Sequence, residues 1–181
     1  MDEWLLARIV GYLAPLANAG GDQAMLLGES LDLIGQAGGG DGSYTVSWAV
    51  EAGPSTDSGQ FSVTAESETQ FTPAAPGEYT LRFTVDDELQ DAVSDSIAVT
   101  VYAPIEADAG RNQSTFAGNS VTLHGQATGG NEPYNYTWSV VSGPDRSPSQ
   151  ISDTASPESS FTPSTAGAYV LQLTVDDGDQ A

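Results

Sequence analysis

Two pairs of adjacent aspartates are the residues whose type and spacing could do chemistry. Each pair follows an alternating apolar stretch, and two further acidic residues, Glu106 and Asp108, lie in the linker between the two parts of the chain that these stretches end. Carboxylate oxygens that converge at a junction between domains are suitable ligands for Ca²⁺, although no twelve-residue EF-hand loop is present. A solvated acidic loop is the alternative. The residues expected to bind calcium, the one cofactor we predict, are Asp86, Asp87, Glu106, Asp108, Asp176 and Asp177.

His124 is the only histidine of the chain. It stands 90 positions after Ile34, and its neighbour Leu123 alternates with it as Leu33 does with Ile34. This alternation places His124 on the exposed side of a strand. Catalysis would need a partnered serine or carboxylate in a recognisable motif, and no such motif is visible. We therefore predict that the chain is not an enzyme and has no catalytic residues.

Two short motifs match the acceptor pattern for N-glycosylation, asparagine followed two positions later by serine or threonine. They are Asn112-Gln113-Ser114 and Asn135-Tyr136-Thr137. Both asparagines are expected to face solvent. The pattern is short and often unused, so glycosylation at Asn112 and Asn135 depends on whether the source modifies its surface proteins.

The composition is strongly acidic. The chain has 181 residues with 25 Asp and Glu against four Lys and Arg, a net charge of -21. Binding to nucleic acid or to an anionic membrane needs positive surface, so the charge argues against both. It favours divalent cations and a salty medium, where repulsion is screened. Cysteine is absent, which excludes disulfides, and no apolar run is long enough to span a bilayer.

Two parts of the chain repeat at a spacing of 90 residues, and the alignment needs no gap. Trp48 corresponds to Trp138, for example. Longer matches join Gly35-Gln36-Ala37 to Gly125-Gln126-Ala127, Phe71-Thr72-Pro73 to Phe161-Thr162-Pro163, and Val85-Asp86-Asp87 to Val175-Asp176-Asp177. Two units that share a register over most of their length share one fold.

The sequence pattern of each unit predicts short strands separated by turns. In residues 79–85, apolar side chains alternate with polar ones, which is typical of a strand with one buried face. Trp48 and Trp138 are expected to centre the two cores. The Gly-x-Tyr ahead of this strand is typical of a tyrosine corner. The pattern predicts an all-β chain of two tandem immunoglobulin-like β-sandwiches.

A set of motifs occurs in the same order in both units: Ala-x-Ala-Gly, Gly-x-x-Leu/Val-x-Leu-x-Gly, Tyr-x-x-x-Trp, Gly-Pro, Phe-Thr-Pro and Gly-x-Tyr-x-Leu-x-Leu/Phe-x-Val-Asp-Asp. The set resembles the polycystic kidney disease (PKD) domain family over nearly the whole chain past residue 18. The usual Asp-Phe-Gly-Asp-Gly after the tryptophan is missing, which is similar to the PKD-like branch found in tandem arrays on large surface proteins. The resemblance implies an extracellular location and an adhesive or spacer role, without a reaction.

The chain is expected to divide into an N-terminal extension at 1–17, a first sandwich at 18–104 and a second at 105–181. In the first sandwich, a last strand at 94–102 follows the aspartate pair. In the second, only Gly178 to Ala181 follows, so its last strand is missing. A sandwich without this strand exposes unpaired backbone beside its strongest strand.

Residues 1–14 stand in register with 91–104, and they are apolar on both faces of a potential strand. Three interpretations stay open: a strand that enters the groove of a neighbouring subunit, a fragment cut from a longer array, or an amphipathic helix that ends at Pro15. In the first, contacts run head to tail and build filaments. The residues expected to carry this self-assembly are Trp4, Leu6, Val10 and Tyr12.

Two classes of function follow. The first is a non-catalytic structural protein of the cell surface: a filament or pilus-like subunit joined by N-terminal strand donation, or a stalk segment of a large adhesin. Its partners would be further copies of itself or neighbouring repeats of a longer chain. The second is an accessory carbohydrate- or protein-binding module of a secreted hydrolase, which would need an exposed aromatic strip. We favour the first, because the aromatic residues fall mainly on inward faces.

Overall fold

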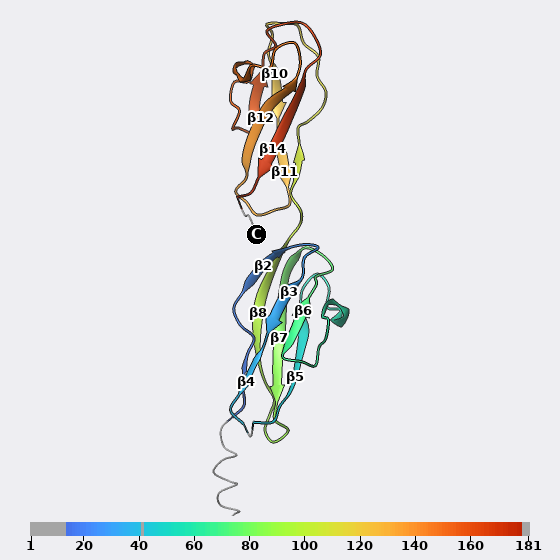
Figure 1. Cartoon of the computed structure of the whole chain (residues 1–181), viewed down its shortest axis with the longest axis vertical. Helices are drawn as coiled ribbons and strands as arrows, with labels where there is room; N and C mark the ends of the chain where they lie inside the picture. The colour runs from blue at the N-terminus through green and yellow to red at the C-terminus, as the bar shows by residue number, and fades with distance from the viewer. Residues whose placement is uncertain (1–13, 41, 179–181) are drawn as a thin grey trace, which may run out of the picture. The chain divides into compact units, whose positions relative to one another are not determined.

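The computed structural model describes residues 14–40 and 42–178 (Figure 1). The chain divides into two compact units between Ala103 and Pro104. We call them unit 1 and unit 2. Each is built from strands that connect through tight turns and one short 3₁₀ turn, at Ser58–Gln60 in unit 1 and Pro148–Gln150 in unit 2. The prediction of an all-β chain with two tandem immunoglobulin-like sandwiches is confirmed.

The sheets of unit 1 use eight strands. Their bounds are β1 Leu16–Asn18, β2 Gln23–Leu26, β3 Leu31–Ile34, β4 Gln36–Gly38, β5 Thr45–Ala52, β6 Glu68–Phe71, β7 Gly77–Asp86 and β8 Val93–Tyr102. The main sheet has the order β2-β8-β7-β5, and β3 pairs with β6 and β1 with β4. Strand β8 is antiparallel to β7 and parallel to β2.

Strand β7 forms the middle of unit 1 because its alternating sequence gives it one apolar face. Tyr79, Leu81, Phe83 and Val85 are at most 1% exposed. Trp48, at 2% exposed, packs on Phe83 with ring centroids 4.9 Å apart. These side chains form the centre of the unit 1 core, as the alternation predicts.

The strands of unit 2 lie 90 residues after those of unit 1. They are β9 Glu106–Asp108, β10 Val121–His124, β11 Gln126–Thr128, β12 Asn135–Ser142, β13 Glu158–Phe161 and β14 Val170–Asp176. Pairs β9–β11, β10–β13 and β12–β14 repeat β1–β4, β3–β6 and β5–β7. Even the irregular register between Val50 and Ala52 recurs between Val140 and Ser142. Trp138 is buried, as predicted.

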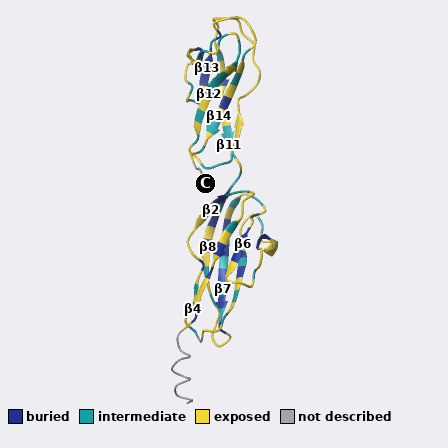
Figure 2. Ribbon diagram, in the orientation of Figure 1, coloured by how far each residue is buried: buried dark blue, intermediate teal, exposed yellow. Residues whose placement is uncertain are grey.

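The two units differ on one side of the main sheet. Among the described residues, unit 2 has no counterpart of β2 or β8. Leu81 and Val85 of β7 are fully buried, whereas their counterparts Leu171 and Val175 of β14 are half-buried. Figure 2 shows this loss of burial along β14. The core of unit 2 is therefore covered less completely than that of unit 1.

The Gly-Pro motif of each unit has a packing reason. A Cβ added to Gly53 would lie 2.5 Å from Cδ1 of Tyr79, and one added to Gly143 would lie 2.4 Å from Cδ1 of Tyr169. Each tyrosine ring thus occupies the space that any larger residue would need. The tyrosine corner and the Gly-Pro turn form one packed feature in both units.

Candidate functional site

The first aspartate pair stabilises the loop that follows β7. Asp86 accepts a hydrogen bond from the Glu88 backbone N–H at 2.8 Å through Oδ1. Asp87 is 4% exposed, and its Oδ1 accepts from the backbone N–H groups of Leu89 and Gln90 at 3.2 and 3.0 Å. These are bonds of a carboxylate that fixes its own turn.

The second pair has the same place in unit 2. Asp176 accepts from the Gly178 N–H at 2.7 Å, and Oδ2 of Asp177 accepts from the Asn131 N–H at 3.0 Å. A Cβ on Gly130 would lie 2.4 Å from that oxygen, so the glycine turn fits closely around Asp177. Asp177 therefore joins the end of β14 to the turn after β11, whereas the bond of Asp176 lies within its own turn.

The acidic residues predicted for the linker are the first and last residues of strand β9 in unit 2. Glu106 and Asp108 are exposed, and Asp108 accepts from the Gly110 N–H at 2.8 Å. Within residues 14–40 and 42–178, no group of three or more His, Cys, Asp or Glu side chains is placed to hold a metal ion. Calcium binding by the six carboxylates stays a prediction.

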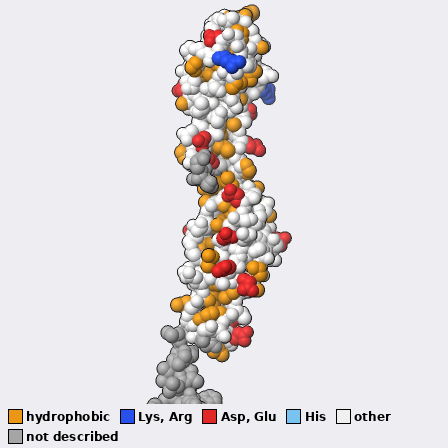
Figure 3. All heavy atoms as spheres, in the orientation of Figure 1, with side chains coloured by type: hydrophobic (Ala, Val, Ile, Leu, Met, Phe, Trp, Pro, Cys, Tyr) orange, Lys and Arg blue, Asp and Glu red, His pale blue; other side chains and the backbone are white. Residues whose placement is uncertain are grey.

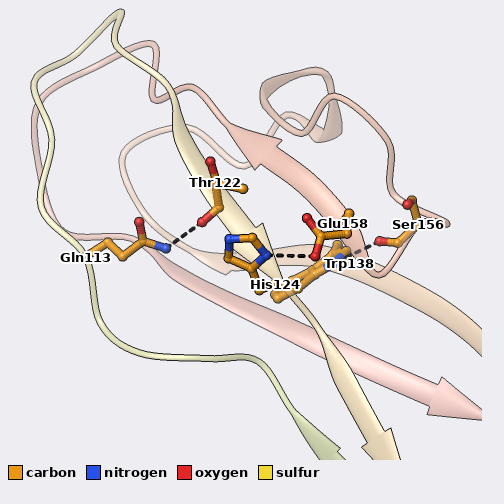
Figure 4. Close-up of polar contacts among 6 residues, drawn as sticks. All are labelled: Gln113, Thr122, His124, Trp138, Ser156 and Glu158. Carbon is orange, nitrogen blue, oxygen red and sulfur yellow. Dashed lines mark hydrogen bonds and ion pairs between the residues drawn. The ribbon is translucent and has the colours of Figure 1, made fainter.

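His124 lies on the exposed side of β10, where the alternation placed it (Figure 4). Its Nδ1 lies 2.9 Å from Oε1 of Glu158 on the neighbouring strand β13, and the two side chains are 60% and 71% exposed. The sequence did not reveal this partner, because the register of two strands far apart in the chain has to be known first. An ion pair this exposed contributes little to stability.

The two candidate glycosylation sites are accessible. Asn112 lies in an exposed segment outside any strand, and Asn135 is the exposed first residue of β12. Both asparagines are exposed, as expected, and their modification stays a prediction.

A buried glutamine that the sequence did not single out organises each variable loop. Gln60 donates to the carbonyls of Ser55 and Asp57 and accepts from the Ala74 N–H. Gln150 makes the same three kinds of bond in unit 2, with Asp145, Ser147 and Ser164. The one sequence signal that could have identified these two glutamines is that they occupy the same position in the 90-residue repeat. Each glutamine therefore holds its loop in place through hydrogen bonds to the backbone.

The pKa of Asp145 in this loop is lowered. A hydrogen bond from the Ser164 hydroxyl at 2.7 Å is the main cause, followed by one from the Ser147 backbone N–H at 2.8 Å. Both bonds favour the ionised carboxylate. At neutral pH, Asp145 is thus a charged loop stabiliser rather than a proton donor.

The free edge of β14 is the strongest candidate for a functional site. In unit 1, β7 has β5 on one side and β8 on the other. In unit 2, β14 pairs with β12 at one edge, and within the described residues no strand lies along its other edge. Exposed backbone of this kind can pair with a strand from another chain.

The segment equivalent to β2 adds to this open side. Residues 113–116 correspond to β2, yet they form no strand, and Phe116 is 81% exposed. The Nε2 of Gln113 donates to the carbonyl of Thr122 at 2.6 Å, which attaches the segment to β10 (Figure 4). Among the residues described, Phe116 is the most exposed large apolar side chain.

Figure 3 shows several acidic side chains along the visible face of unit 1. Across the described ranges, no helix has the length and apolar character needed to cross a membrane. The residues predicted for self-assembly, Trp4, Leu6, Val10 and Tyr12, lie outside the described residues.

Several solved structures share the fold. Domains 3–5 of the extracellular part of Drosophila OTK align with a TM-score of 0.52 at 15% identity, covering 91% of this chain and 60% of that one. The eight N-terminal domains of Down Syndrome Cell Adhesion Molecule give 0.54 at 17%, covering 90% and 27%. The IG1+IG2 pair of DIP-gamma gives 0.52 at 13%, covering 91% and 92%. These likenesses show the tandem immunoglobulin-like fold.

The comparison with family models gives a more specific result. No curated protein matches the chain. However, the model described as "K319L-like, PKD domain" matches residues 19–101 and 109–181. One matched stretch lies in unit 1 and the other in unit 2, and together they cover most of the chain. The chain therefore belongs to the K319L-like PKD domain family.

Proposed function

We propose that this chain is a non-catalytic structural module of a cell-surface protein, and that its copies join head to tail by strand donation. Residues 2–13 of one copy are the donor, and the free edge of β14 in another copy is the acceptor. The product is a filament or pilus-like assembly. A stalk segment of a large adhesin, in which neighbouring repeats of one chain supply the strand, uses the same edge.

The free edge of β14 is the observation that carries the proposal. The equivalent edge in unit 1 is filled by β8, which buries Ile97, Val99 and Val101 to 3% exposed or less. An unfilled edge leaves apolar side chains and backbone polar groups accessible, a state that favours association. The location is supported by the shared fold, which occurs in the extracellular domains of OTK and in a cell adhesion molecule.

The accessory-module alternative has less support. Stacking on sugar rings needs a strip of exposed aromatic residues. Phe61, whose position was open, is 6% exposed, and Phe116 alone among the described aromatic residues is exposed. One ring does not provide a strip, so we favour the structural role.

Deletion of residues 2–13 tests the proposal. We expect the full chain to form multimers that grow with concentration, by light scattering after size-exclusion chromatography, and fibres in electron micrographs. The deleted chain should be monomeric with an unchanged far-ultraviolet circular dichroism spectrum, since β1 begins at Leu16. Multimers that persist after the deletion, or a full chain that stays monomeric, would contradict strand donation.

A further inference from the structure

Strands β2 and β8 of unit 1 form the one parallel pair among the strands of the described chain. The pairing runs from Gln23 with Val99 to Leu26 with Tyr102, so the paired residues are 76 positions apart. The backbone N–H of Leu27 extends it with a bond to the Tyr102 carbonyl at 2.8 Å. The ladder is nevertheless short, because β2 has only four residues.

Two aspartates lengthen this ladder at its N-terminal end. The backbone N–H of Ala98 donates to Oδ1 of Asp22 at 2.8 Å, and the backbone N–H of Ala19 donates to Oδ2 of Asp95 at 2.9 Å. One carboxylate lies just before β2 and the other lies on β8, so the two bonds run between the same chain segments in opposite senses. Each joins residues 76 positions apart, as the paired residues of the two strands are.

Residues 19–26 therefore run beside residues 95–102 in a single register, and we call these two segments together the parallel clamp. Side chains on its inner side are buried, since Ala19 is 3% exposed, Met25 is 6% exposed and Val99 is fully buried. A hydrogen bond from a backbone N–H to a carboxylate is stronger than one between neutral groups. The aspartates thus add two strong bonds to a ladder of four residue pairs.

The place of the clamp in the chain decides how tension acts on it. The chain reaches the clamp through β1 and leaves it after Tyr102, towards unit 2. Tension along the chain therefore pulls residues 19–26 at their first residue and residues 95–102 at their last. Because the segments are parallel, the two forces act along the strands in opposite directions. All bonds of the clamp then carry load together, and the segments separate only when these bonds break almost at once.

The clamp is the shorter of the two attachments of β8. This strand pairs with β7 over nine positions, from Gly77 with Val101 to Val85 with Val93, and with β2 over four. Tension should accordingly separate β2 from β8 before it separates β8 from β7. The resistance of unit 1 to stretching is therefore determined by the clamp.

We infer that unit 1 bears tension through the parallel clamp, and that Asp22 and Asp95 are the side chains that set the strength of the clamp. The load-bearing property belongs to unit 1 alone and does not require strand donation. Its use at a cell surface rests on the proposed structural role.

Pulling single molecules of the full chain from two pairs of attachment points tests the clamp. The chain has no cysteine, so handles can be attached to two engineered ones. Ala14→Cys with Pro104→Cys loads the two segments along the strands in opposite directions. Ala14→Cys with Ala92→Cys pulls both segments at the same end, because Ala92 lies just before β8, and the bonds then break one after another. All three positions are exposed and lie outside the strands.

At one loading rate, the first pair of handles should require an unfolding force at least about threefold that of the second pair, because forced unfolding is governed by the unfolding barrier. Equal forces in the two directions, or a larger force for the second pair, would overturn the load-bearing clamp. Neither outcome involves the edge of β14, so the proposed strand donation would stand.

Substitution of the two aspartates tests their contribution. At constant force on the first pair of handles, Asp22→Ala and Asp95→Ala should each shorten the lifetime of folded unit 1 about tenfold, because each removes a hydrogen bond to a charged group. On the second pair of handles, each should change the lifetime less than about twofold, because the bonds there break singly. Asp22→Asn should recover part of the lost lifetime, since its carboxamide oxygen still accepts a hydrogen bond.

Glu51→Ala is the matched control. Glu51 accepts from Nη1 of Arg82 at 3.1 Å and from the Ser96 hydroxyl at 3.2 Å, on the same sheet, and neither partner belongs to β2. Its loss should change the lifetime on the first pair of handles less than about twofold. Equal shortening on both pairs of handles by the aspartate variants would show a general loss of stability and overturn their role in the clamp. If Asp95→Ala does not fold, the exposed Asp22 decides the question.

Discussion

At the scale of single residues, the two tyrosine corners allow a direct comparison of closed and open cores. The hydroxyl of Tyr79 donates to the Ala75 carbonyl at 3.0 Å and accepts from the Ala75 N–H at 3.3 Å, and the ring is 1% exposed. The hydroxyl of Tyr169 donates to the Thr165 carbonyl at 3.0 Å, but its ring is half-buried and Thr165 is exposed. The same tyrosine motif is thus buried in unit 1 and half-buried in unit 2.

This difference predicts unequal effects of removing the hydroxyl. Tyr79→Phe should lower the free energy of unfolding of unit 1 by about 1 to 2 kcal/mol, because it deprives a buried corner of its hydrogen bonds. Tyr169→Phe should cost unit 2 about 0.5 kcal/mol, since water can replace the lost bond. Urea unfolding followed unit by unit with pulsed hydrogen exchange measures both. Equal losses in dilute monomer would contradict the prediction.

The aspartate pairs show what residue types and spacing can predict about a site and what they cannot. Their position after the strongest strand was evident from the sequence, and so was their acidity. Calcium ligands and turn-stabilising carboxylates have the same composition, so the sequence could not distinguish them. The structure shows that Asp87 and Asp177 accept backbone hydrogen bonds, which depend on the local path of the chain. The path of the backbone in these turns cannot be derived from residue types and their spacing alone.

At the scale of elements, the 90-residue repeat made most of the fold predictable. Alternation in residues 79–85 determined the buried face of β7, and the same positions in unit 2 formed β14. The parallel pairing of β2 with β8 was not predicted, because β2 has little alternation of its own. The equivalent residues 113–116 of unit 2 form no strand. The segment is therefore a strand in unit 1, where β8 lies beside it, and not in unit 2.

The open edge predicts a matched difference between two leucines. Leu81→Ala should lower the unfolding free energy of unit 1 by about 3 kcal/mol, since Leu81 is fully buried between neighbouring strands. Leu171→Ala should cost unit 2 about 1 kcal/mol in dilute monomer, because Leu171 already has access to water. The same unit-resolved urea unfolding measures both. A loss of about 3 kcal/mol from Leu171→Ala in monomer would mean that the edge is already covered.

At the scale of the whole molecule, the net charge of -21 opposes the association that the open edge favours. Copies that approach end to end bring like charges together, and this repulsion acts over the Debye length. That length falls from about 10 Å at 0.1 M salt to about 3 Å at 1 M. Strand pairing and apolar burial are short-range and are screened far less. Salt should therefore shift the balance towards assembly.

We accordingly predict that raising NaCl from 0.1 M to 1 M increases the multimer fraction of the full chain and raises its melting temperature. Sedimentation velocity and scanning calorimetry measure the two effects, with the chain lacking residues 2–13 as the control that stays monomeric. Weaker association at high salt would show that charge attraction holds the copies together.

A comparison of CaCl₂ with NaCl at matched ionic strength separates the effect of charge screening from the effect of a bound calcium ion. The calcium prediction requires an extra rise in melting temperature that Asp177→Asn removes, and equal melting temperatures in the two salts would contradict it.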